Sequence, residues 1–158
     1  MTYHILIKRE ELQQQADLKS YYMGEAAKRK DNDADTIQSS TDEKELFVMF
    51  LKRALNELTA AVALRFSSIN YKVENEFIEI TFETHDNTRS HLLPMLKQAI
   101  TDHLANEILL HWLQLRQPFM SQPYIALRPT LYHNILQLFA KFYNSRPTRR
   151  RATDLAGI

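Results

Sequence analysis

Residues 47–82 read FVMFLKRALNELTAAVALRFSSINYKVENEFIEITF, and the spacing of the apolar side chains changes within this stretch. As far as Phe66 they recur every three or four positions, which is the period of one helix face. From Ile69 they alternate with polar residues, a period of two that is typical of a half-buried strand. Residues 74–76, Glu-Asn-Glu, separate two such alternating runs. The stretch therefore predicts a helix followed by a β-hairpin.

Three other stretches have helical composition or spacing. Residues 8–30 are rich in Glu, Gln, Ala, Leu and Lys, which lose little on entering a helix. Residues 90–117 have a proline near their start, where a helix tolerates it, and residues 130–144 place apolar side chains on one face. Prolines 118, 123 and 129 predict a broken connector between these two helices. We therefore predict a mainly α-helical fold, a four-helix bundle with a β-hairpin near residues 69–83 inserted between helices two and three.

The hairpin is expected to need a surface to pack on, because a two-stranded hairpin is only marginally stable in water. Residues 3–7 are interpreted as a short apolar lead and not as a third strand. The hairpin would then complete its burial on the helices, on a second subunit or on another partner. The candidate interaction residues are Tyr71, Val73, Ile78, Ile80 and Phe82.

Length and charge distribution predict one domain and a basic tail. The chain has 158 residues, near the common size of a single domain, and a net charge of +1. Residues 141–158 carry five basic side chains and one acidic side chain, a local +4, so the other 15 basic and 18 acidic side chains give −3. We predict a helical domain over residues 1–145 and a flexible tail over residues 146–158. Arg146, Arg149, Arg150 and Arg151 are its candidate contact residues.

Composition excludes several classes of site. The chain has two glycines and no cysteine. A Rossmann fingerprint, a Walker loop and a nucleophile elbow all require glycines at fixed spacing. Disulfides, thiolate zinc sites and iron–sulfur clusters require cysteine. The absence of an apolar run of about 20 residues, together with an N-terminus that soon becomes charged, predicts a cytoplasmic protein with no membrane partner.

The segment Asp31-Asn32-Asp33-Ala34-Asp35 has the alternating oxygen ligands of an EF-hand loop. Thr36, however, occupies the position of the turn-forming glycine, and Asp42 stands where a longer glutamate completes the site. We therefore interpret this segment as a solvated loop without a calcium ion.

His103, Glu107 and His111 follow one another at intervals of four residues in the predicted third helix. At about 100° per residue they share the face of Ile100, so they are expected to point inward. The two histidines are about 12 Å apart along the axis and cannot bind one ion. We predict neither a metal nor a cofactor here, and favour a hydrogen-bonded polar layer or a cleft beside a subunit interface over an active site. Trp112 lies off this face, either as an exposed contact or packed under the hairpin.

The order of these elements resembles that of small virion-assembly proteins of tailed phages and prophages, of the head–tail connector or neck-adaptor type. The resemblance covers roughly residues 8–146 and is carried by TDEKELFVMFLKRALNEL (41–58), YKVENEFIEITF (71–82), LLPMLKQAITDHLANEILLHWLQL (92–115) and RPTRRR (146–151). It implies a helical bundle with a hairpin or long loop between central helices, assembled into a ring. It transfers no functional residue, because fold likeness does not establish a site.

We therefore expect a non-enzymatic structural protein that acts through contacts with copies of itself or with virion proteins, in the cytoplasm or in a virion. One alternative is a nucleic-acid-binding accessory protein that uses the arginine tail with Lys28, Arg29 and Lys30. The other is a metal-dependent or acid–base enzyme built on the three polar residues of the third helix.

Overall fold

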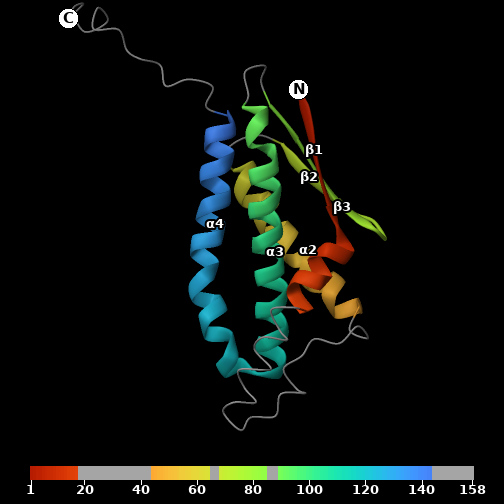
Figure 1. The fold of residues 1–158 in the computed structure, drawn as a ribbon, viewed down its shortest axis with the longest axis vertical. Coiled ribbons are helices and arrows are strands. Elements are labelled where there is room, and N and C mark those ends of the chain that lie inside the picture. Colours follow the sequence, from red (N-terminus) through yellow and green to blue (C-terminus); the bar gives the residue numbers. More distant parts are fainter. Residues whose placement is uncertain (18–43, 65–67, 85–88, 144–158) are drawn as a thin grey trace, which may run out of the picture.

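The computed structural model describes residues 1–17, 44–64, 68–84 and 89–143. The described part is mainly helical, with a small three-stranded antiparallel sheet. Helix α3 (Leu93–Arg116) and helix α4 (Gln122–Tyr143) run side by side, α2 (Lys44–Ala63) lies behind them, and the sheet lies beside α3 (Figure 1). Residues 9–17 are also helical, and their buried Leu12 and Ala16 belong to the common core.

The sheet has the order β1-β3-β2, so that β3 (Phe77–Glu83) lies between β1 (Thr2–Lys8) and β2 (Ile69–Val73). Strands β2 and β3 form the predicted hairpin, in which Tyr71 lies opposite Ile80. On its other side β3 pairs with β1, and Ile5 lies opposite the same Ile80. Because successive side chains of a strand point to opposite faces, this register places one apolar row against the helices.

The interpretation of residues 3–7 as a lead outside the sheet is wrong, because they form most of strand β1. This strand supplies the hairpin with the third strand that it was expected to lack. Ile78, Ile80 and Phe82 are buried inside the chain and are therefore not available as a contact surface for another molecule. The other two candidates, Tyr71 and Val73, are partly buried against the core, and the Tyr71 hydroxyl donates to Asn56 Oδ1 of α2 at 2.6 Å.

An aromatic cluster joins the sheet to the end of α4. The ring of Phe82 lies edge-on to Phe139 and Phe142, with centroid distances of 5.3 and 5.5 Å. Tyr3 of β1 lies 5.0 Å from Phe142 in the same edge-on geometry. Edge-to-face pairs at such distances add to the stabilisation that burial provides. The second half of α4 is therefore attached to the sheet by hydrophobic packing.

The third helix ends at Arg116, one residue before the predicted end, and begins at Leu93, three residues after the predicted start, because residues Ser90–Leu92 form the 3₁₀ turn η2. The fourth helix begins at Gln122, eight residues before the predicted start, directly after the 3₁₀ turn η3 (Pro118–Ser121). Pro123 is tolerated because first-turn amides have no partner within a helix. Pro129 lies inside α4 and removes one hydrogen bond from its backbone.

Several predicted features lie outside the described residues: the continuation of the first helix to residue 30, the loop 31–41 with its EF-hand likeness, and the tail 146–158 with its four arginines. The four-helix arrangement therefore stays a prediction. Among the helices that the structure describes, none is long and apolar enough to cross a membrane.

The alternation in β1 generates a direct test with two neighbouring residues. Ile7 is fully buried, whereas the side chain of Leu6 is on the outer face of the sheet and the residue is 50% exposed. We expect Ile7→Ala to lower the free energy of unfolding by about 2–4 kcal/mol, because it leaves a cavity in the core. Leu6→Ala should change it by less than about 0.5 kcal/mol. Urea unfolding followed by circular dichroism measures both, and equal losses would contradict the role of β1 in the core.

Candidate functional site

Helix α3 is enclosed in the middle of the molecule, and every residue from 103 to 113 is buried. The helix contacts α2, α4 and β1. The buried residues include His103, Glu107 and His111, which the sequence places on the inner face, and also Asn106. Buried polar groups of this kind are normally compensated by partners within the protein.

The carboxylate of Glu107 is fully buried and lies between the side chains of Arg128 and His111. Its Oε1 is 2.7 Å from Nε of Arg128 in α4, and its Oε2 is 3.6 Å from Nε2 of His111. Among the described residues neither oxygen has a partner with the alignment of a hydrogen bond, so the contact with Arg128 is an ion pair.

Arg128 connects this buried carboxylate to the surface. Its Nη2 donates to Oε2 of Glu57 in α2 at 2.7 Å. Oε1 of the same Glu57 lies 3.4 Å from Nε of Arg53, one turn earlier on α2. A row of alternating charges thus runs from the core through a partly exposed guanidinium to exposed side chains. Neither Arg128 nor Glu57 was expected from the sequence as part of the site.

The charge state of Glu107 results from two opposing effects. Burial by itself raises the pKa of the Glu107 carboxyl. The interaction with His111 and the positive charge of Arg128 act in the opposite direction. They prevail, and the pKa of Glu107 lies below its ordinary value, so the carboxylate is ionised at neutral pH.

His103, by contrast, is uncharged at pH 7, because burial lowers the pKa of its imidazole. The Glu107 and Glu57 carboxylates raise this pKa, but they do not outweigh the burial. Nδ1 of His103 is buried without a hydrogen-bond partner among the described residues. Its ring centroid lies 6.0 Å from that of Tyr132 on α4.

A pocket of about 310 Å³ lies beside His103, where α2, α3 and α4 meet. Its lining residues are Glu57, His103, Arg128, Pro129 and Tyr132. Glu107 is not among them and lies behind Arg128. The pocket therefore presents a neutral imidazole and a guanidinium, while the buried carboxylate is out of reach of a ligand.

The three polar residues of α3 do not form one cluster. Glu107 and His111 are brought together, and the His111 ring stacks on Phe50 of α2 with a centroid distance of 5.5 Å. His103 faces the pocket instead. Within the ranges that the structure describes, no group of three or more His, Asp or Glu side chains is arranged to hold a metal ion.

Asn106 is a further polar residue that sequence reasoning missed. It is fully buried, and its Nδ2 donates to the backbone carbonyl of Tyr124 at 3.3 Å. Together with the ion pair of the adjacent Glu107, this bond attaches α3 to the first half of α4. The sequence feature that could have identified Asn106 is the position of an asparagine in an otherwise apolar part of the predicted helix.

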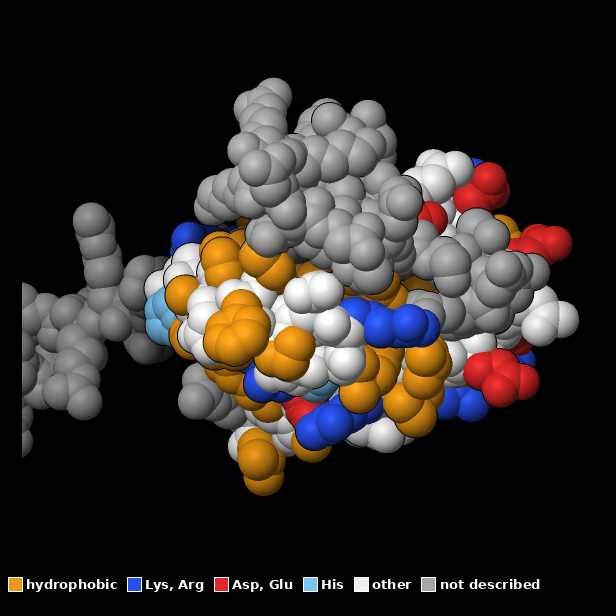
Figure 2. All heavy atoms as spheres, turned by 90° about the horizontal axis from the view of Figure 1, so that it is seen from below, with side chains coloured by type: hydrophobic (Ala, Val, Ile, Leu, Met, Phe, Trp, Pro, Cys, Tyr) orange, Lys and Arg blue, Asp and Glu red, His pale blue; other side chains and the backbone are white. Residues whose placement is uncertain are grey.

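A second feature of the surface is the end of the molecule where α3 passes through η3 into α4. Phe119 of η3 is 90% exposed and Leu115 of α3 is 62% exposed. We call these two residues the apolar end. Viewed from this side, the described surface shows hydrophobic side chains beside Lys and Arg side chains (Figure 2). Trp112 is buried, so its interpretation as an exposed contact is wrong.

Comparisons with known proteins give no assignment: no family model matches this chain, and neither a curated protein nor a solved structure is significantly similar to it. Function is therefore argued from the two features above, the pocket beside His103 and the apolar end.

The lowered pKa of His103 predicts that the protein loses stability on mild acidification. In the unfolded chain this residue takes up a proton near its ordinary pKa of 6.5, whereas the native state resists protonation until a lower pH. The unfolded state therefore binds more protons, and the free energy of unfolding falls as pH drops from about 7 to about 5.5. Glu107 adds a further loss only below its ordinary value of 4.5, because its native pKa is also lowered.

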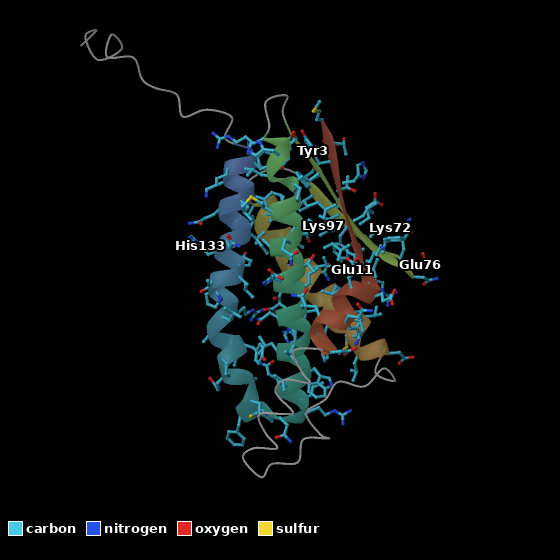
Figure 3. The ribbon with its side chains drawn as sticks, viewed as in Figure 1. Tyr3, Glu11, Lys72, Glu76, Lys97 and His133 are labelled. Carbon is cyan, nitrogen blue, oxygen red and sulfur yellow. The ribbon has the colours of Figure 1, made fainter. Side chains whose placement is uncertain are left out.

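The measurement is urea unfolding at a series of pH values. His103→Gln should flatten the decline between about pH 7 and pH 5.5. His133→Gln is the matched control, since His133 is exposed on the outer side of α4 (Figure 3). An unchanged slope in His103→Gln would contradict the neutral buried state of His103.

Proposed function

We propose that this chain is a non-enzymatic subunit of a protein assembly, which contacts copies of itself through the apolar end. The observation that carries the proposal is the nearly complete exposure of Phe119, with Leu115 exposed one helical turn before it. Aromatic side chains are enriched in the buried centres of protein interfaces. A second copy would remove these two side chains from water.

The turn that presents Phe119 is held in place by its own hydrogen bonds. The Ser121 hydroxyl donates to the Pro118 carbonyl at 2.6 Å, and the amide of Met120 donates to the carbonyl of Gln117 at 3.0 Å. An interface that uses an ordered turn loses less conformational entropy on binding than one that must order a loop. This local order supports a role of the turn in contacts.

The proposal agrees with the resemblance to head–tail connector proteins, but it changes the contact surface. The hairpin was expected to pack on the helices, on a second subunit or on another partner, and its candidate residues Ile78, Ile80 and Phe82 are buried within the chain. The apolar end is therefore the better candidate for a contact with another copy. An acid–base enzyme on α3 has less support, because Glu107 lies behind Arg128 and cannot reach a substrate in the pocket. The nucleic-acid alternative depends on residues outside the described ranges.

Sedimentation velocity over concentrations from about 10 µM to about 1 mM tests the proposal. We expect the wild-type chain to associate, and Phe119→Ser to weaken the association at least about tenfold, since it removes the largest exposed apolar side chain among the described residues. Leu64→Ser is the control, because Leu64 is 88% exposed at the far end of α2 and lies outside the apolar end. A wild-type chain that stays monomeric throughout, or equal effects of the two substitutions, would refute self-association through this surface.

A further inference from the structure

The pocket beside His103 is a second surface feature, independent of the assembly function. Three helices supply its walls: Glu57 from α2, His103 from α3, and Arg128, Pro129 and Tyr132 from α4. Its volume of about 310 Å³ is at the lower end of the range for small-molecule sites. Pro129 and Tyr132 contribute rings to the lining, and the other three lining side chains are polar. A pocket of this kind suits a small ligand with one polar group and an apolar body.

The charged side chains of the pocket have spare hydrogen-bond donors and occupied acceptors. A guanidinium has five N–H donors, and the contacts of Arg128 with described residues use only Nε and Nη2. A neutral imidazole adds one N–H donor and one acceptor nitrogen. The Glu57 carboxylate, by contrast, has both oxygens engaged, one by Arg128 and the other by Arg53. Spare hydrogen-bond donors therefore outnumber spare acceptors among these side chains, which favours a ligand that accepts hydrogen bonds.

The carboxylates that already face Arg128 limit how much negative charge the ligand can carry. Arg128 already faces two carboxylates, those of Glu107 and Glu57, so a dianion would meet repulsion from a buried negative charge. A monoanion can instead take the place of Glu57. The side chains of Glu57 and Arg128 are 45% and 40% exposed, and exchange at such an exposed ion pair costs little.

We propose that this pocket binds a small monocarboxylate. The carboxylate lies against the guanidinium of Arg128 and the imidazole of His103, in the position from which Glu57 withdraws. A planar carboxylate matches the two parallel N–H donors of a guanidinium, which favours it over other monoanions. The apolar body of the ligand packs between Pro129 and Tyr132.

Benzoate is the probe, with benzamide as its neutral isostere, and binding is followed by isothermal titration calorimetry and by amide chemical shifts. We expect saturable benzoate binding with a dissociation constant on the order of 1 mM, and benzamide binding at least about tenfold weaker. Chemical shifts should change at the residues that line the pocket.

Glu57→Gln tests the exchange step without removing the binding group. Because it weakens the internal competitor of the ligand, it should tighten benzoate binding about threefold to tenfold and leave benzamide binding unchanged. Glu57 is on the surface, so this variant should fold, and Glu45→Gln on the exposed start of α2 is the matched control.

Three outcomes would overturn the proposal. The first is the absence of saturable benzoate binding in both the wild type and Glu57→Gln. The second is equal affinity for benzoate and benzamide, which would show an apolar pocket without selection of a carboxylate. The third is benzoate binding that Glu57→Gln weakens or leaves unchanged, which would place the ligand elsewhere.

Discussion

The ion pair between Glu107 and Arg128 is the interaction on which the arrangement of α3 and α4 depends. Glu107 is fully buried, and it lies in a stretch of α3 in which every residue from 103 to 113 is buried. Its pKa is lowered, so a negative charge resides there at neutral pH. An isolated charge in such a place would be very costly, and Arg128 is the cation at ion-pair distance. The position of Arg128 therefore fixes how α4 lies against α3.

The two halves of α4 are attached by different interactions. The second half buries Ile135, Leu138, Phe139 and Phe142, and its aromatic rings pack on the sheet. The first half buries no whole side chain. It is connected to α3 through Asn106 and Glu107, and its Tyr124 and Tyr132 pack, partly buried, against the core. A buried ion pair seldom adds net stability compared with apolar packing, but it selects one alignment of the helices. In this molecule the pocket lies between helices in that alignment.

The sequence was informative wherever the decisive contacts are local. Local sequence patterns placed the hairpin and α3 within three residues, and the angular position of His103, Glu107 and His111 agreed with their burial. It failed where contacts are distant along the chain. Strand β1 pairs with a partner about 75 residues away, and its seven residues are too few for periodicity to indicate a sheet. Arg128 lies in what reads as a proline-broken connector, so its pairing with Glu107 gave no local signal.

A double-mutant cycle on Glu107→Gln and Arg128→Gln measures the central interaction most directly. We expect Arg128→Gln alone to lower the free energy of unfolding by about 3–5 kcal/mol, because it leaves a buried carboxylate without its cation. The double variant should recover a large part of that loss, which gives a coupling energy of about 2 kcal/mol or more. Additive effects, with a coupling below about 0.5 kcal/mol, would contradict the dependence of the helix arrangement on this ion pair.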